Sequence, residues 1–283
     1  MTHAFFDSHM HTPLCKHATG EPEEYAERAV EQGLQGIIFT CHSPMPHGFW
    51  PNVRMSEAQF DEYVELIARC RAQFTGVLDV RLGMESDYFP GYENWIEKLH
   101  QRAEFHHCLG SVHWQGPEYG DKFNAHDEHA FRKSYWENLA ASAETGLFDT
   151  LAHPDLIKNY RAASWSFETS QDDIAAALDR IARTGVAMEL NTSGQLKIYK
   201  EMNPGPQMLA MMCQRKIPVV IGSDSHNSYR VGDNFIPALN LLEKAGYKTV
   251  SRFENRKRID LPLHEVRHQL AHAADREEAL VPA

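Results

Sequence analysis

Histidine and carboxylate side chains recur in this sequence at short spacings that suit metal binding. The stretch Ile221–His226 places Asp224 and His226 just after an apolar, β-branched run. Near the other end of the sequence, His9 and His11 are two residues apart, so on an extended chain both imidazoles point the same way. Imidazoles and a carboxylate that leave strand ends together are typical ligands of divalent transition metals. The sequence therefore predicts a metal site.

Other candidate ligands follow other apolar segments of the chain. The full set is His9, His11, His17, His42, Glu85, His113, His153, Asp224 and His226. So many nitrogen and oxygen ligands exceed what one tetrahedral or octahedral ion can use, so two or three ions are implied. Glu85 and Asp224 are the two acids of the set, which makes them the candidates to bridge neighbouring ions.

Each of these residues also has a simpler interpretation. A single histidine at a strand end, such as His42 or His153, is more often hydrogen-bonded than a metal ligand. His17 stands in a loop, where water could solvate it. Glu85 could pair with Arg81, because positions i and i+4 of a strand share one side. The metal interpretation therefore depends on these residues meeting at one place.

Alternating strands and helices must bring the candidate ligands to one site. Strands are predicted at residues 4–8, 36–41, 77–84, 108–112, 149–152, 186–190 and 219–222. Helices are predicted at residues 22–32, 56–73, 127–145 and 170–184, the second opened by a capping box of Ser56 and Gln59. Six of the seven strands end on His, Asp or Glu. An α/β barrel collects such strand ends on one face, so we predict one α/β domain over residues 1–283, with a C-terminal helical tail from about residue 254.

Composition limits the function classes. A net charge of -11 argues against nucleic-acid binding through a broad basic face and favours small substrates. The 5 cysteines form no Cys-x-x-Cys pair, which argues against a disulfide framework and favours a reducing cytoplasm. No segment approaches the roughly 18 apolar residues of a membrane span, and no secretory signal is recognisable. We expect a soluble cytoplasmic protein with no membrane partner. A homo-oligomer is compatible with the sequence.

Six short motifs carry the candidate ligands in order along the chain. They are Asp7-Ser-His9-Met-His11, Thr40-Cys-His42, Gly83-Met-Glu85, Gly110-Ser-Val-His113, Ala152-His153-Pro154 and Ser223-Asp224-Ser-His226. Together they closely resemble the PHP (polymerase and histidinol phosphatase) superfamily. Gly110-Ser-Val-His113-Trp114 and Met84-Glu85-Ser-Asp87-Tyr88 are most similar to its histidinol-phosphate phosphatase branch. The resemblance implies a distorted, TIM-like (β/α)7 barrel with a trinuclear metal site at the C-terminal ends of the strands.

The resemblance also implies how the ligands divide among zinc, manganese or iron ions. The first ion would take His9, His11, Glu85 and Asp224. The second would share Glu85 and add His113 and His153. The third would take His17, His42 and His226.

The activity implied by the resemblance is hydrolysis of L-histidinol phosphate to L-histidinol and phosphate, a step of histidine biosynthesis. A hydroxide held between two ions has a pKa lowered toward neutrality and would attack phosphorus without a protein nucleophile. Glu85, Asp224 and His226 would be the catalytic residues. A phosphodiesterase or exonuclease of the same superfamily is the alternative, with a broad phosphoesterase beside it. A metal-stabilised module without catalysis is the third interpretation.

Cations in loops after the strands are candidates to bind the phosphate. They are Arg54, Lys158, Arg161, Lys197 and Arg230. We favour Arg161 and Lys197, which follow the fifth and sixth strands. Glu189 and Asn191, at the end of the sixth strand, could face polar groups of the substrate.

Overall fold

The computed structural model describes the backbone of residues 4–280 and the side chains of residues 4–271. Residues 1–3 and 281–283 of the predicted domain lie outside the described part. One sheet runs in sequence order through β1 (Phe6–Asp7), β2 (Gly36–Phe39), β3 (Asp79–Asp87), β4 (His107–Ser111), β5 (Thr150–Leu151), β6 (Ala187–Asn191), β7 (Val219–Gly222), β8 (Thr249–Glu254) and β9 (Lys257–Pro262). Neighbours from β1 to β8 are parallel, and β9 is antiparallel to β8.

The sheet closes between the residues that follow β1 and those that follow β7. Met10 forms a parallel bridge with Ser225. The His11 N–H donates to the Ser225 carbonyl at 2.9 Å, and the Ser225 N–H donates to the His9 carbonyl at 3.2 Å. The predicted α/β fold is confirmed. Strands β1 to β7 form a distorted barrel, because isolated bridges, Met10 with Ser225 and Thr19 with Asn227, close it in place of a continuous ladder. This closure brings the first and last predicted ligands side by side.

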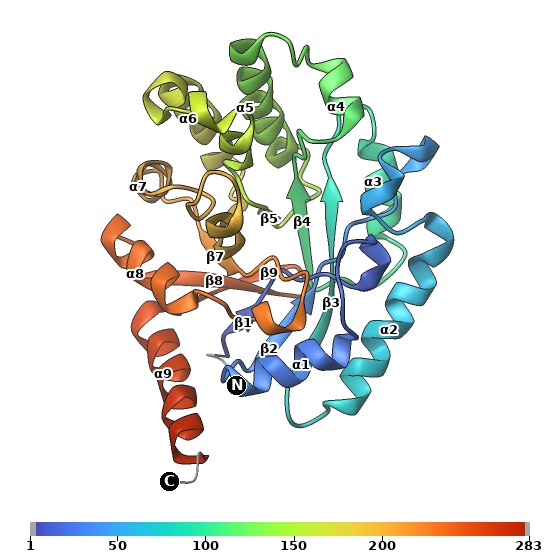
Figure 1. Ribbon diagram of the computed structural model, residues 1–283, viewed down its shortest axis with the longest axis vertical. Coiled ribbons are helices and arrows are strands. Elements are labelled where there is room, and N and C mark those ends of the chain that lie inside the picture. Colours follow the sequence, from blue (N-terminus) through green and yellow to red (C-terminus); the bar gives the residue numbers. More distant parts are fainter. Residues whose placement is uncertain (1–3, 281–283) are drawn as a thin grey trace.

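Helices surround the strands (Figure 1). They are α1 (Pro22–Glu31), α2 (Phe60–Gln73), α3 (Glu93–His100), α4 (Pro117–Lys122), α5 (Glu128–Glu144), α6 (Phe167–Ala182), α7 (Pro206–Gln214), α8 (Phe235–Ala245) and α9 (Leu263–Leu280). The four predicted helices correspond to α1, α2, α5 and α6. The capping box of Ser56 and Gln59 is present, and it opens a short 3₁₀ turn (Glu57–Gln59) that leads into α2. No helix among the described residues is both long and apolar enough to cross a membrane.

Alternation along the strands separates two apolar regions. On β2, Ile37 and Phe39 belong to the main core shared with the helices, whereas Ile38 clusters with Phe6. Successive side chains of a strand point to opposite faces, so one face of β2 packs on helices and the other lies inside the barrel. The apolar residues stabilise the body of the barrel. The predicted ligands lie at the end of the barrel where the strands end.

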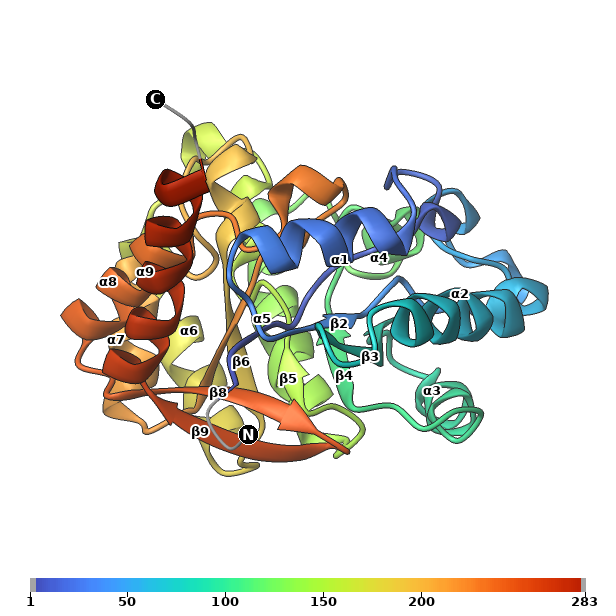
Figure 2. The same cartoon turned by 90° about the horizontal axis from the view of Figure 1, so that it is seen from below.

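The hairpin of β8 and β9 crosses the end of the barrel where the strands begin (Figure 2). At this end the ring of His107, at the start of β4, stacks on Phe253 with centroids 4.8 Å apart. Arg256, in the turn of the hairpin, pairs with Asp149 at 3.0 Å. The predicted helical tail therefore begins at Leu263 rather than near residue 254, because residues 257–262 pair with β8.

Candidate metal centre

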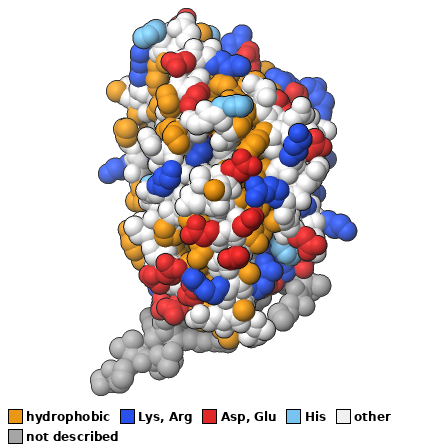
Figure 3. Space-filling model, turned by 90° about the vertical axis from the view of Figure 1, so that its right-hand side faces the viewer, with side chains coloured by type: hydrophobic (Ala, Val, Ile, Leu, Met, Phe, Trp, Pro, Cys, Tyr) orange, Lys and Arg blue, Asp and Glu red, His pale blue; other side chains and the backbone are white. Residues whose placement is uncertain are grey.

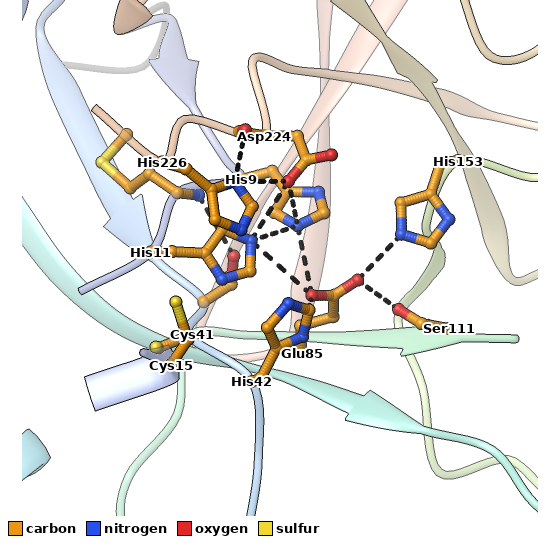
Figure 4. A network of polar contacts seen from close by, with 12 residues as sticks. His9, His11, Cys15, Cys41, His42, Glu85, Ser111, His153, Asp224 and His226 are labelled. Atoms are coloured by element: carbon orange, nitrogen blue, oxygen red, sulfur yellow. Dashed lines mark hydrogen bonds and ion pairs between the residues drawn. The ribbon is translucent and has the colours of Figure 1, made fainter. Parts of the chain in front are cut away.

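The carboxylate of Glu85, on β3, lies at the centre of the predicted ligands (Figure 4). Its side chain is only 1% exposed. Oε2 lies 2.8 Å from His42 Nδ1, 3.5 Å from His9 Nε2 and 3.7 Å from His11 Nε2. Arg81, the alternative partner, pairs with Asp79 and Glu254 instead. One oxygen of Glu85 thus faces three imidazoles.

The other oxygen of Glu85 faces a second group. Oε1 lies 3.0 Å from His153 Nε2 and 3.6 Å from His113 Nε2, and it accepts a hydrogen bond from the Ser111 hydroxyl. Because the two oxygens of one buried carboxylate face different sets of imidazoles, Glu85 has the geometry of a carboxylate that bridges two ions.

Asp224 approaches the same centre from the segment after β7. Its Oδ1 lies 3.2 Å from His11 Nε2 and 3.6 Å from His9 Nε2. The two imidazole nitrogens are themselves 3.2 Å apart. Oδ2 accepts hydrogen bonds from Ser193 Oγ at 2.9 Å and Asn191 Nδ2 at 3.3 Å, which fix the carboxylate. Two imidazole nitrogens converge on a carboxylate oxygen here, and this arrangement suits an ion between them.

The remaining ligands form a third group. His17, His42 and His226 each offer a nitrogen, and these atoms lie within 4.8 Å of one another. Nε2 of His226 is buried and has no hydrogen-bond partner among the described residues. An unpaired buried imidazole nitrogen is costly, and a bound ion would satisfy it. Cys15 also lies within this distance of His11 and His226, although its position in the sequence did not indicate it.

Two of the predicted ligands sit in strained backbone conformations. His153 has φ 30° and Asp224 has φ 51°. Residues other than glycine rarely adopt positive φ, and such strain persists only where the surroundings hold it. The His153 N–H donates to Glu189 Oε2 at 2.8 Å, which fixes the backbone of His153 in this conformation. The strand ends are therefore shaped to aim these side chains.

Glu189, on β6, supports the ligands from beneath. Nδ1 of His9 donates to Glu189 Oε1 at 2.7 Å, which leaves Nε2 pointing to the centre. A metal-ligating histidine commonly gives its other nitrogen to a carboxylate in this way. A Cβ on Gly222 would lie 2.1 Å from Glu189 Oε1, so only glycine fits there. The expectation that Glu189 faces the substrate is wrong, because this side chain is 1% exposed and fully engaged.

Arg54 was predicted to bind phosphate, but the structure buries it elsewhere. Its side chain is 2% exposed, and Nη2 pairs with Asp87 Oδ2 at 2.6 Å. Nη1 and Nε donate to the carbonyls of Ser43 and Trp50. Oδ1 of Asp87 accepts from His113 Nδ1 at 2.7 Å. Burial raises the pKa of Asp87, but the charges of Arg54 and His113 outweigh it and hold that pKa below its usual range. Arg54 therefore orients a predicted ligand through Asp87.

Replacing Arg54 with alanine should lower the free energy of unfolding by about 3 kcal/mol, because Asp87 would remain buried without its cation. Arg180 pairs with Glu144 at the surface at 2.6 Å and serves as the control. Arg180→Ala should cost less than about 1 kcal/mol. Urea unfolding of both variants gives the comparison. Equal free energies of unfolding in the two variants would show that the pair of Arg54 and Asp87 stabilises the protein no more than a surface pair does.

The other predicted phosphate ligands differ in position. Arg161 is exposed and pairs with Glu128, Arg230 pairs with Asp233, and Lys158 is buried against Asp155 and Glu201. Lys197 is 38% exposed, and its Nζ lies 4.0 Å from Asp224 Oδ2. Of the predicted cations, all of which lie in the described part of the chain, the structure brings Lys197 alone to the ligand cluster.

Charges and burial within the cluster favour the ligating form of its carboxylates and of His42, but not of every imidazole. Burial lowers the pKa of His9 and His11, yet the neighbouring acidic groups outweigh it and raise the pKa of His11 to about 9 and that of His9 well above its usual value, so a metal ion would displace their protons. Burial raises the pKa of Glu85, but His42 and His9 outweigh it and hold that pKa well below its usual range. Asp224 has its pKa lowered in the same way, chiefly by His9 against burial. Burial lowers the pKa of His42 to about 4 despite Glu85. Charged carboxylates and neutral imidazoles are the forms that bind metal.

A cavity of about 120 Å³ opens above the cluster. It is lined by His17, His42, Trp50, Val53, His113, Gln115, His153, Leu156, Lys197, Asp224 and His226. Imidazole nitrogens and carboxylate oxygens of this kind fit zinc, manganese or iron.

The fold and the ligand cluster together define an α/β-barrel protein with a site for two or three divalent transition-metal ions. The model of the PHP domain family matches residues 7–193. This chain belongs to the PHP domain family.

Curated relatives match over most of the chain. A probable histidinol-phosphatase of Deinococcus radiodurans is 38% identical over 259 residues, covering 89% of this chain and 97% of the relative. The histidinol-phosphatase of Bacillus subtilis is 27% identical over 254 residues, covering 80% and 95%. Among solved structures, histidinol phosphate phosphatase from Lactococcus lactis, complexed with zinc, L-histidinol and phosphate, has a TM-score of 0.76 at 20% identity, covering 90% of this chain and 98% of that one. This last likeness supports the barrel fold.

Proposed function

We propose that this chain is a metal-dependent phosphomonoesterase that hydrolyses L-histidinol phosphate to L-histidinol and phosphate. The observation that carries the proposal is the position of Glu85, whose two oxygens face separate groups of imidazoles. A purely structural metal site would need about four ligands, and this cluster has more than twice as many. The substrate in this proposal is taken from the names of the relatives, which are called histidinol-phosphatase. The compartment that suits a biosynthetic step of this kind is the cytoplasm.

The proximity of the candidate ligands supports a division among three ions, although His42, assigned to the third ion, also lies 2.8 Å from Glu85 Oε2. The first ion would take His9, His11, Glu85 and Asp224, the second Glu85, His113 and His153, and the third His17, His42 and His226. When bound, such ions lower the pKa of water and neutralise phosphoryl oxygens. Glu85, Asp224 and His226 are catalytic as parts of this centre. The cavity lining contains no serine or cysteine among the described residues, and its histidines and Asp224 are the proposed metal ligands, so the nucleophile in this proposal would be water.

The described chain also acts as one domain in this proposal. The strands share one sheet, and Val266 of α9 is buried against the rest of the molecule. In this proposal the hairpin of β8 and β9 and the described part of α9 extend the barrel.

Lys197 is the proposed phosphate ligand. Lys197→Ala should raise KM for the phosphate ester about tenfold, because a charge-assisted contact of about 1.5 kcal/mol would be lost. Metal content should stay unchanged, since Lys197 is not among the proposed ligands. Arg161→Ala, at the exposed pair with Glu128, is the control and should leave KM unchanged. Steady-state kinetics give KM and kcat for both variants, and metal analysis gives their metal content. A normal KM in Lys197→Ala would remove this residue from the phosphate site.

A nuclease is the weaker candidate. An extended polyanion usually binds along a basic track, whereas the net charge here is -11. On the face in Figure 3, basic and acidic side chains are interspersed. A cavity of about 120 Å³ also suits a small ester better than a polymer.

Phosphate release tests the proposal. The manganese- or zinc-loaded protein is assayed with L-histidinol phosphate, a generic aryl phosphate and a short single-stranded DNA. We expect kcat/KM for L-histidinol phosphate to exceed the others by at least 100-fold. Equal rates on the aryl phosphate would indicate a broad phosphoesterase, and preferred cleavage of DNA would indicate the nuclease. No metal-dependent turnover at all would indicate a module without catalysis.

A further inference from the structure

The cavity over the metal centre has two kinds of lining. Its floor consists of the proposed ligands, and Lys197 adds a cation beside Asp224. Its remaining wall is mostly apolar and consists of Trp50, Val53 and Leu156, with the amide of Gln115 beside them. A phosphate group belongs to the charged floor. The apolar wall is therefore available to the part of the substrate that the reaction releases as an alcohol.

Trp50 holds its place in this wall at a conformational cost. Its backbone has φ 37° and ψ 62°, the left-handed region that a bulky side chain rarely adopts. Strained conformations of this kind concentrate at ligand sites, where the surrounding structure maintains them. The strain itself does not identify a ligand, but it shows that the position of this indole is maintained.

Four contacts maintain the position of Trp50. The Trp50 N–H donates to Glu118 Oε1 at 2.9 Å, and the Trp50 carbonyl accepts from Arg54 Nε at 3.1 Å. A Cβ on Gly116 would lie 3.3 Å from the indole, so the ring packs closely on that backbone. The ring also meets His113 edge to face, with centroids 6.2 Å apart. The indole is thus fixed between the loop before α4 and a proposed ligand of the second ion.

We propose that Trp50 determines which alcohol the site accepts, by packing its indole against a heteroaromatic ring of the leaving group. This inference rests on the proposed function, whose substrate carries an imidazole ring. Aromatic pairs gain from offset or edge-to-face packing, and a flat ring fits an aromatic wall better than a flexible chain does. All phosphomonoesters carry the phosphate group that the charged floor would bind. Selection among different phosphomonoesters must therefore come from the apolar wall, which contacts the alcohol part.

The test compares two substrates that differ only in the imidazolylmethyl group. O-Phosphoethanolamine keeps the phosphate, the two carbons and the amine of L-histidinol phosphate but lacks the imidazolylmethyl group. The selectivity ratio is kcat/KM for L-histidinol phosphate divided by kcat/KM for O-phosphoethanolamine. We expect Trp50→Ala to lower this ratio at least tenfold and Trp50→Phe to keep it within about threefold of the wild type. Trp165→Ala, in a separate cavity, is the matched control and should keep the wild-type ratio.

Binding without turnover gives a second measurement. Calorimetry with L-histidinol on the zinc-loaded protein should show at least tenfold weaker binding in Trp50→Ala than in Trp165→Ala. An unchanged ratio and unchanged L-histidinol affinity in Trp50→Ala would overturn the inference, and so would an equal fall in kcat/KM for both substrates. Failure of the proposed function is distinguishable, because the wild type itself would then show no preference for L-histidinol phosphate.

Discussion

Glu85→Gln should lower kcat for L-histidinol phosphate by at least a thousandfold, equivalent to about 4 kcal/mol of transition-state stabilisation. The substitution keeps the size of the side chain but replaces one charged oxygen by an amide nitrogen, which cannot ligate an ion. Because the two oxygens of Glu85 lie 2.8 Å from His42 Nδ1 and 3.0 Å from His153 Nε2, one change affects both halves of the centre. Zinc content should fall by at least one ion per chain.

The control for this variant is Glu243→Gln, at a surface pair with Arg267 that lies 2.9 Å apart. It should keep both the activity and the metal content of the wild type. Metal analysis of the purified variants, together with initial rates, makes the comparison. Full activity and full metal content in Glu85→Gln would contradict the bridging role.

Metal removal should have the second largest effect. Dialysis against a chelator should reduce activity below about 1% and lower Tm by more than about 10 °C. Each ion bound at a thousandfold excess over its Kd stabilises the native state by about 4 kcal/mol, so two ions contribute about 8 kcal/mol. For a chain of this length each kcal/mol corresponds to about 2 °C or more. The metal-free protein would also retain the buried charges of Glu85 and Asp224 without the cations that offset them.

Adding back zinc or manganese should restore both quantities, and chelator already saturated with zinc should change neither. Calorimetry and phosphate release follow the two effects in parallel. An unchanged Tm and retained turnover after chelation would mean that the cluster works without metal.

The clustering of the candidate ligands could be predicted because their positions follow from the fold. In a parallel barrel the strands end on one face, so a histidine or acid directly after an apolar strand falls in a shared site. His9, His113, His153 and Asp224 illustrate this, since they come from four different strands yet lie around Glu85. His17 comes from a loop, and it joins the cluster because that loop packs beside the segment after β7.

The supporting residues were harder to predict because their partners are distant in sequence. Glu189 reads as a polar group at a strand end, but its contact with His9 spans 180 positions. Arg54 is a loop cation in the sequence, and its ion-pair partner, Asp87, lies on β3. The nearest available signal for Asp87 was its spacing of two from Glu85, which places both on the same side of the strand. The hairpin of β8 and β9 was missed because its short strands contain many charged residues.

Anomalous X-ray diffraction from crystals of the zinc-loaded protein tests the central claim most directly. The account predicts at least two zinc peaks, each about 2.0–2.2 Å from a different oxygen of Glu85, with imidazole nitrogens completing each site. A single peak that does not touch Glu85, or zinc bound only elsewhere on the chain, would contradict the carboxylate-bridged centre.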